Sequence, residues 1–589
     1  MQVTPVVRAL ESRLRRVVRA DKEEAGAVVI LVAMLLVVFM GCAAIAVDLG
    51  REQVVAAQLQ KAADAGALAG AVYLPGNLAT AQSVAQAVAL QNVRVGLSGP
   101  VTVTSVLGIR PTQLKVTVSG PMTFTFGQAI GINGTTVTRT ATADFSGPTP
   151  MGSPCNILGR EDMPSDSQTG QAPVASANCS GAGTYWVNIA GTYVNKARGD
   201  AYADLWCTQP DDGKGIDGCS IPNSTAGNPG TNTEYDPNGY IYTVRVTTAG
   251  ILNLQGYDIA WVATGDNCTD NLAGASAVSN TYVTDGAKRY ATGTSAYCTG
   301  DTQMNYYDGD LSAVKTIVTV RAPAATSINP LDGTTLCQRS WNGWGDQYAS
   351  PSTYANPNPT LGKALDLATL LNFKSPSYDS SLAEVFHRWA NLCTGNPNGM
   401  YVTPGDYSIQ VQTVGGGGQN RFGLRASLDS GNSNVSIFAN GKESMFNNVN
   451  AGVSEFFLVR LGSGAAAHTL TLRFFDMGDA TAPVSAVVLQ PDNSNLTAGA
   501  PWSGCVGIGP TGGASPGSLL SNCTVTTTSA TNGGRWQSIQ VPIPSNYVCN
   551  ADSDQSKCWI KIKLTTTAAQ ADTTTWAASM DGDPVRIIR

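Results

Sequence analysis

The stretch AGAVVILVAMLLVVFMGCAAIAV, which runs from Ala25 to Val47, contains 23 residues and no charge. About 20 apolar residues form a helix long enough to cross the hydrocarbon core of a bilayer. Six cations precede this stretch, whereas the nearest cations after it are Arg51 and Lys61. Because arginine and lysine favour the cytoplasmic side, we expect a single-pass membrane protein. Residues 1–24 would be cytoplasmic, residues 25–47 would span the membrane, and the bulk would be extracellular or periplasmic.

Three kinds of processing compete with a retained anchor. A signal peptide could be cleaved after Ala44-Ile45-Ala46, although the apolar run is longer than the roughly 7–15 residues of a signal-peptide core. A lipoprotein could be acylated at Cys42, but Phe39 is a poor residue three positions before such a cysteine. Cleavage after Gly26, as in type IV pilins, would favour Glu five residues later, where Leu31 stands. We therefore expect the segment to be retained.

The cysteines also indicate export. Of the thirteen, only Cys42 lies in the apolar run, and none of the others forms a C-x-x-C pair. Twelve cysteines are many for a reducing compartment, so up to six disulfides are expected, although free buried thiols remain the alternative. Pairing of nearest neighbours is the simplest arrangement. It would join Cys155 to Cys179, Cys207 to Cys219, Cys268 to Cys298, Cys337 to Cys393, Cys505 to Cys523, and Cys549 to Cys558.

The composition favours β structure. Charged residues make up 13% of the chain, against about 25% in ordinary soluble domains. Glycine, threonine, serine and asparagine fill the difference, as in β-sandwiches joined by tight turns. The net charge of −6 includes no basic stripe, so nucleic acid is not an expected partner.

Beyond the apolar stretch the helical pattern continues, and one helix is expected from about Ala27 to Tyr73. Its second half is rich in alanine and carries Gly66 and Gly70 one turn apart. Small residues at this spacing allow a second helix to approach closely. The partner could be a helix of another protein in the membrane, or the helix could lie on its own domain.

Three ordered motifs are found in this region: Glu24-x-Gly26-Ala27, then Ala46-Val47-Asp48-Leu49-Gly50, then an alanine-rich run from Gln58 to Ala71. Together they resemble the N-terminal region of the TadE/TadG-like family of tight-adherence (Flp) pilus assembly proteins. Three later segments resemble the exported region of large TadG-like proteins: GGGGQNRFGLRA (Gly415–Ala426), LTLRFFDMGDA (Leu470–Ala480) and TTTWAASMDGDPVRI (Thr573–Ile587). The resemblance implies an envelope protein linked to pili or adhesion, with no catalytic residues. The D-x-S-x-S metal motif of some relatives is absent.

The exported part is expected to be mainly β, following the N-terminal α segment. Residues 48–147 would form a helical extension and a small α+β unit. Two disulfide-stapled domains of sandwich or jelly-roll type would follow at 155–330 and 397–589, joined by a linker at 331–396 with a helix at Ser380–Cys393. Alternation is clearest at Leu470, Leu472 and Phe474, and at Ile560, Ile562 and Leu564, as expected for strands packed on one face.

No motif indicates catalysis. His387 and His468 are the only histidines, which leaves no histidine-based metal cluster and only two possible bases for a Ser/His/Asp triad. The G-x-S-x-G match at Ser515 is flanked by glycine and proline, without the strand and helix of a nucleophile elbow. We expect a protein that is not an enzyme.

No cofactor is expected, with calcium as a weak alternative. Acidic loops can supply its oxygen ligands, although Asp in turns more often bonds nearby backbone. The candidates are Asp476, Asp479, Asp581 and Asp583. Trp341, Trp344 and Trp559 could form a platform for cell-wall or host glycans; alternatively, these indoles cap cores beside the disulfides.

Two functions remain open. The first is a structural or assembly protein whose partners are the membrane and pilus or other envelope proteins. The second is a surface adhesin or lectin-like protein that acts independently of pili.

Overall fold

In the computed structural model the chain forms two compact units, residues 1–145 with 585–589, and residues 146–584. The structure describes residues 5–588 with gaps, and side chains only from residue 28 onward. The gaps are 75–77, 94–95, 109–112, 146–148, 160–184, 209–214, 222–227, 264–298, 304–312, 325–328, 345–369, 372–374, 394–398, 450–451, 479–481, 510–516, 569 and 581–584.

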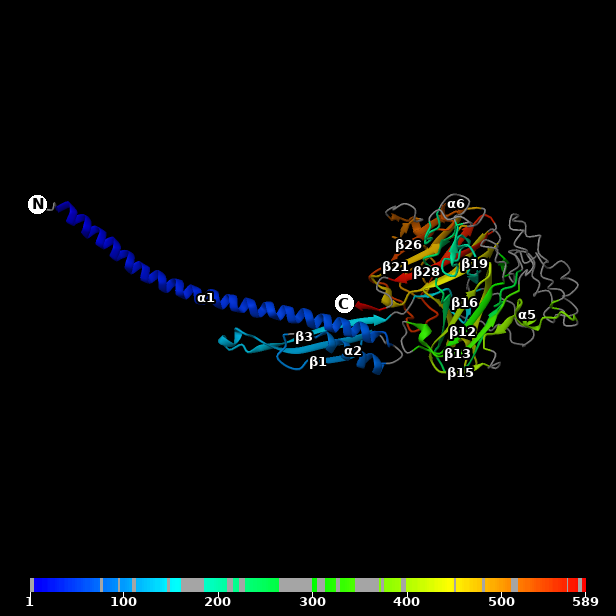
Figure 1. The fold of residues 1–589 in the computed structure, drawn as a ribbon, viewed down its shortest axis with the longest axis horizontal. Helices are drawn as coiled ribbons and strands as arrows, with labels where there is room; N and C mark the ends of the chain where they lie inside the picture. The colour runs from blue at the N-terminus through cyan, green and yellow to red at the C-terminus, as the bar shows by residue number, and fades with distance from the viewer. Residues whose placement is uncertain are drawn as a thin grey trace. The chain divides into compact units, whose positions relative to one another are not determined.

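The first unit is built around one long helix. Helix α1 (Pro5–Ala71) begins well before the expected start at Ala27, and α2 (Leu78–Asn92) follows it. In Figure 1 α2 and an antiparallel sheet lie along the C-terminal half of α1. The sheet has the order β1 (Thr102–Leu107), β2 (Gln113–Thr123), β3 (Gly134–Phe145) and β29 (Val585–Ile588).

The core of this unit consists of small helical residues against a β face. Ala63 and Ala67 of α1, Ala85 of α2, and Leu114 and Val116 of β2 are all buried together. Alanine suits this interface because it favours helix and lets the backbones approach closely. The expected α+β unit is thus present, and it includes a strand from the far end of the chain, which the sequence patterns did not indicate. Val585 to Ile588 pair with Phe145 to Thr142.

The second unit contains two large antiparallel sheets in its described part. The first has the order β14 (Trp389–Asn391), β10 (Gly250–Tyr257), β17 (Gly418–Leu428), β6 (Tyr185–Ala190), β19 (Lys442–Val449), β28 (Gln570–Met580), β21 (Thr469–Phe475), β26 (Trp536–Pro542), β23 (Val506–Ile508) and β24 (Ser518–Leu519). Three short strands join it at the side: β5 (Ile157–Leu158) and β11 (Thr302–Gln303) on β17, and β15 (Met400–Val402) on β10.

The second sheet has the order β13 (Thr335–Trp341), β12 (Lys315–Arg321), β16 (Gly405–Val414), β9 (Tyr240–Val246), β18 (Val435–Asn440), β4 (Pro150–Met151), β20 (Gly452–Arg460), β27 (Trp559–Thr566), β22 (Val484–Leu489) and β25 (Thr524–Thr527). A short pair, β7 (Trp206–Cys207) with β8 (Gly230–Thr231), and helix α6 (Ser529–Asn532) lie outside the two sheets.

The two sheets bury their apolar faces in one common core, as in a β-sandwich. Tyr242 and Val244 of β9 and Leu424 of β17 belong to the same buried cluster as Leu472 of β21 and Ile562 of β27. The expected alternation is confirmed on β21 and β27, where every second residue is buried. The mainly β fold predicted from composition is therefore present.

The division into two sandwich domains differs from the structure. Strands from both expected ranges are interleaved: β9, from the first range, pairs with β16 and β18 from the second, and β10 pairs with β17. The expected linker contributes β13, which pairs with β12. The alternation within a single strand carries no information about which strands pair, and the loops around residues 331–396 therefore do not mark a domain boundary.

The helix expected at Ser380–Cys393 is also shorter than predicted. Helix α5 spans Ser380–Val385, is capped by Asp379, and is followed by β14. His387 adopts a φ of 48°, a left-handed conformation that an α-helix does not continue through. The pattern of apolar residues extended over both elements and did not show the break.

Four nearest-neighbour disulfides are confirmed. They join Cys207 to Cys219, Cys337 to Cys393, Cys505 to Cys523, and Cys549 to Cys558. Cys155 is also disulfide-bonded, but Cys179, Cys268 and Cys298 lie outside the described residues. Cys42 is a free, exposed thiol in α1.

Candidate functional site

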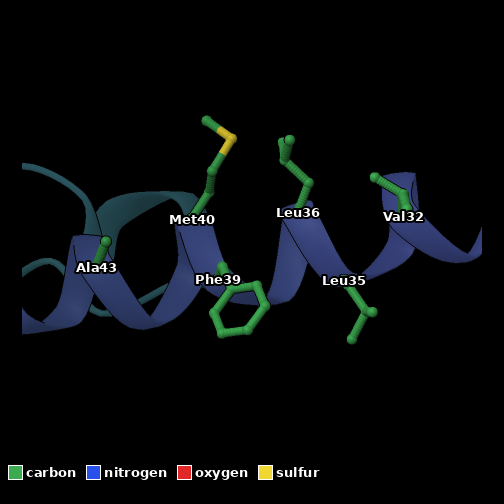
Figure 2. A pocket seen from close by; sticks show the side chains of 6 residues that line it. All are labelled: Val32, Leu35, Leu36, Phe39, Met40 and Ala43. Atoms are coloured by element: carbon green, nitrogen blue, oxygen red, sulfur yellow. The ribbon is translucent and has the colours of Figure 1, made fainter.

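The apolar segment of α1 is exposed along its described length. From Val28 to Val47 every residue is exposed except Ala44, which is half-buried. Figure 2 shows six of its side chains, spaced three and four residues apart, which flank one face of the helix. They line a shallow hollow, all of whose lining residues belong to α1 itself. Such a surface is stable in lipid and not in water, and it is long and apolar enough to cross a membrane.

Asp48 ends the apolar segment and binds a loop of the neighbouring sheet. Its carboxylate accepts hydrogen bonds from the backbone N–H groups of Thr125, Phe126 and Gly127 at 2.7–2.9 Å. Burial raises the pKa of Asp48, but the three N–H donors and Arg51 outweigh it, so the pKa lies below its ordinary value. An ionised Asp48 therefore fixes the tip of the β2–β3 hairpin to the helix.

The tip of that hairpin is itself apolar. Phe126 and Ile132, on either side of the short helix η1 (Gly127–Ile130), are 48% and 51% exposed. Since Asp48 directly follows the apolar segment, these side chains lie at the level on α1 where a bilayer surface would be.

Gly66 and Gly70 of α1 pack against α2 of the same chain. A Cβ atom on Gly66 would lie 2.7 Å from the carbonyl oxygen of Ala85 in α2, and one on Gly70 would lie 2.5 Å from that of Ala81. Gly66 and Gly70 therefore allow α1 to pack closely on α2 within the chain, which is the second of the two possibilities left open by the sequence.

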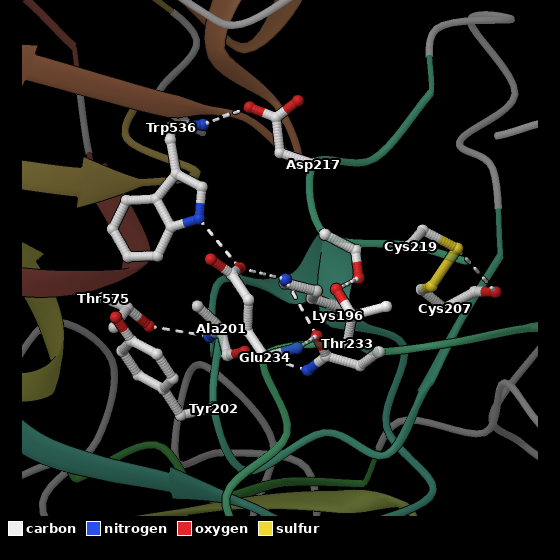
Figure 3. A network of polar contacts seen from close by, with 12 residues as sticks. Lys196, Ala201, Tyr202, Cys207, Asp217, Cys219, Thr233, Glu234, Trp536 and Thr575 are labelled. Atoms are coloured by element: carbon white, nitrogen blue, oxygen red, sulfur yellow. Dashed lines mark hydrogen bonds and ion pairs between the residues drawn. A yellow bond between two sulfur atoms is a disulfide. The ribbon is translucent and has the colours of Figure 1, made fainter. Parts of the chain in front are cut away.

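A buried polar cluster in the second unit was not indicated by any sequence motif. Lys196, on the short helix η3 (Lys196–Arg198), has no exposed surface. Its Nζ donates to Asn232 Oδ1 at 2.9 Å and to Glu234 Oε2 at 2.5 Å. Figure 3 shows Lys196 at the centre, with Trp536 above Glu234 and the Cys207–Cys219 disulfide beside the cluster. Nothing in the local sequence distinguishes Lys196 from a surface lysine.

Burial controls the electrostatics of this cluster. It lowers the pKa of the Lys196 amine, although Glu234, Asp204 and Asp217 oppose the shift. Burial also raises the pKa of Asp204 well above its usual range, with a further increase from Asp200. Neither carboxyl oxygen of Asp204 has a hydrogen-bond partner among the described residues. Uncharged forms of both side chains are thus favoured here more than in water.

The calcium prediction finds no support in the described residues. Asp476 is buried and accepts a hydrogen bond from the N–H of Gly534. Asp479, Asp581 and Asp583 lie outside the described residues. Where side chains are described, no group of three or more histidine, cysteine, aspartate or glutamate residues is arranged to hold a metal ion.

The three tryptophans considered for a glycan platform do not form an exposed aromatic surface. Trp341 and Trp559 are only 5% and 4% exposed. Trp344 is half-buried, and its Nε1 donates to Asp379 Oδ2 at 2.8 Å. The indoles contribute to cores, as the alternative held, and glycan binding loses its structural basis.

Comparison with known proteins identifies one segment of the chain. Residues 26–72 match a family described as "Putative Flp pilus-assembly TadE/G-like", which confirms the resemblance noted in the sequence. The matched segment includes the apolar stretch except for Ala25, and it also includes Asp48, Gly66 and Gly70. Comparisons with curated proteins and with solved structures give no match.

Proposed function

We propose that this protein is a membrane-anchored envelope protein that takes part in the assembly or function of Flp-type pili. The observation that carries the proposal is the exposed apolar segment of α1, which lies within the TadE/G-like residues 26–72. The helix holds the protein in the membrane, and the β-sandwich unit on the exported side provides a surface for pilus or other envelope proteins.

The proposed mechanism is display and association, without catalysis on an external substrate. Two features support an exported position for the sandwich. Arginine and lysine are concentrated before the apolar segment, and four disulfides are formed in the described part of the sandwich.

The orientation can be tested on intact cells. Protease added from outside should degrade the sandwich unit, and carbonate washing should leave the remaining anchor in the membrane. Full protection of the sandwich, together with reduced cysteines, would contradict the proposed topology.

The link to pili requires a genetic test. Deletion of the protein should reduce the number of surface pili, and expression of the full chain should restore them. Expression of a chain in which Leu35, Leu36 and Phe39 are replaced by arginine should not, because each charge at the middle of a membrane helix costs roughly 2.5–3.5 kcal/mol. Normal pili with lost surface attachment would favour the pilus-independent adhesin instead.

A further inference from the structure

Lys196 and Asn232 are placed like an amine and a carboxamide that could acylate it. The Lys196 side chain has no exposed surface, and its Nζ lies 2.9 Å from Asn232 Oδ1. Lysine is almost never fully buried without a partner. The partner here is an amide as well as a carboxylate, which distinguishes the pair from an ordinary buried ion pair.

The Asn232 carboxamide is held rigidly and its carbonyl is polarised. Oδ1 accepts the backbone N–H of Glu234 at 3.0 Å in addition to the lysine amine. Nδ2 donates to the carbonyl oxygens of Ala201 and Asp204 at 2.9 and 2.7 Å. When the lysine amine attacks the carbon, the Glu234 N–H remains on the oxygen and stabilises the negative charge that develops there.

The Glu234 carboxylate is placed to accept a proton from the Lys196 amine. Its Oε2 lies 2.5 Å from Lys196 Nζ and accepts the indole N–H of Trp536 at 2.9 Å. One side of the amine is apolar: Nζ lies 5.1 Å from the centre of the Phe475 ring, which belongs to a buried cluster with Ile216 and Trp536. Charged groups lie nearby as well, since Asp204 and Asp217 act on Lys196 and Arg473 lies 3.8 Å from Glu234. Desolvation of this kind favours the uncharged, nucleophilic amine, and burial accordingly lowers the pKa of Lys196.

We propose that Lys196 and Asn232 form an intramolecular amide cross-link, with Glu234 as the catalytic residue. Lys196 Nζ attacks Asn232 Cγ and a new Nζ–Cγ bond forms. The Cγ–Nδ2 bond then breaks, and its electron pair leaves on Nδ2. Glu234 accepts a proton from Nζ and returns it for the departing nitrogen, so ammonia is released and Glu234 is regenerated. No oxidant, metal or second substrate is required.

This cross-link would close the same part of the chain as the Cys207–Cys219 disulfide, since residues 207 and 219 lie between 196 and 232. The two links differ in one respect: reduction opens the disulfide and leaves an amide intact. The inference concerns the second unit alone and does not depend on the proposed role in pili.

Mass spectrometry of the full-length exported protein tests the proposal directly. After reduction, alkylation and tryptic digestion, we expect a branched product that joins residues 161–198, uncleaved at Lys196, to residues 215–245. Its mass should be lower than the sum of the two peptides by one ammonia. Recovery of only linear peptides, with free Lys196 and intact Asn232, would show that the three residues form an ion pair and nothing more.

Variants separate the chemistry from folding. Glu234→Gln should abolish the branched product while the four disulfides still form, and Asn232→Ala should abolish it as well. A branched product of unchanged yield in Glu234→Gln would overturn the role of Glu234. Lys442 provides an internal control, because its Nζ lies 2.6 Å from Asp236 Oδ2 and has no carboxamide partner among the residues that the structure describes. The linear peptide 426–442 should be recovered from every sample.

Discussion

At the scale of single residues, the sandwich core contains a buried carboxyl group without a hydrogen-bond partner among the described residues. Glu443 on β19 has no exposed surface, and neither of its carboxyl oxygens has a hydrogen-bond partner in the described part of the chain. Gly152 leaves room for it, since a Cβ there would lie 2.7 Å from Glu443 Oε1. Burial raises the pKa of Glu443 to about 8, so the side chain is protonated at neutral pH.

This acid predicts a pH dependence of stability. An unfolded glutamate has a pKa of about 4.3, so between that value and about 8 the folded state binds the extra proton. The free energy of unfolding should therefore fall as pH rises through this range, and level off above it. Each pKa unit is worth about 1.4 kcal/mol, which makes the total loss a few kcal/mol.

Denaturation of the wild type and of Glu443→Gln at several pH values checks this expectation. The amide cannot ionise, so the variant should show a flatter profile and should be the more stable protein above the pKa of Glu443. Glu455→Gln, on the half-exposed face of β20, is the matched control and should keep the wild-type slope. Identical slopes in all three proteins would rule out a titrating Glu443.

Asp48 gives a second prediction at this scale. Asp48→Asn replaces a carboxylate that accepts three backbone N–H groups, and its amide nitrogen cannot accept. The N–H groups of Thr125 to Gly127 should exchange with solvent deuterium faster than in the wild type. Asp64→Asn is the control, because Asp64 bonds Gln60 one turn away on the same helix. Unchanged exchange in Asp48→Asn would show that the loop does not depend on the charge.

At the scale of elements, α1 performs two tasks in succession. Its first part is a bare apolar helix, and its second part is the largest component of a packed α+β core. The change occurs at Asp48, where the hairpin tip begins to cover the helix. The packed part depends on glycine, because α2 approaches too closely for a side chain.

This packing predicts opposite effects for two glycine substitutions on one helix. Gly70→Leu would force a side chain into Ala81, Ala85 and Leu114 and should destabilise the first unit by about 1–3 kcal/mol or more. In Gly50→Ala the new Cβ atom would have no atom within 4 Å. This substitution should therefore stabilise the helix by about 0.5–1 kcal/mol. Hydrogen exchange of α2 reports both effects. Equal protection of α2 in the two variants would contradict the packing described.

The hairpin tip predicts a second contact with the membrane, if α1 spans it as proposed. A photo-crosslinking phenylalanine analogue at Phe126 should capture lipid in nanodiscs. The same analogue at Leu107 should not, because Leu107 pairs with Leu114, which packs against Gly70. That position is about 33 Å further along the helix than Asp48, at 1.5 Å per residue. Equal capture at both positions, or none at Phe126, would place the hairpin away from the bilayer.

At the scale of the whole molecule, local patterns predicted the elements, and long-range pairing determined the architecture. The apolar stretch, the alternation on β21 and β27, and four disulfide pairs were all readable from neighbouring residues. The pairing of β9 with β16 and of β29 with β3 joins residues far apart in the chain, and no local signal specifies it. The burial of Lys196 depends on segments such as Trp536, which is equally invisible in the sequence around residue 196.

Strand β29 supports a prediction at this scale. Removal of residues 585–589 should expose the edge of β3 that pairs with β29, while the edge that pairs with β2 stays covered. Among residues 142–145, the amides that face β29 should therefore lose protection from hydrogen exchange and those that face β2 should keep it. Removal of Arg589 alone, beyond the strand, should change neither set. Loss of protection in both sets would mean that β29 is required for the whole sheet.

The pairing of β29 with β3 affects how the first unit would resist a pulling force. The chain leaves the sheet of the first unit after Phe145 and returns to it at Val585, so two chain segments connect this sheet to the sandwich. Phe145 and Val585 are direct partners in adjacent strands. A force that pulls on the sandwich would act on β3 and β29 at the same end of the sheet. It would therefore not separate these two strands one hydrogen bond at a time. The load would instead act along β3 against the eleven residue pairs that it forms with β2, so that many hydrogen bonds would have to yield together before the sheet slipped.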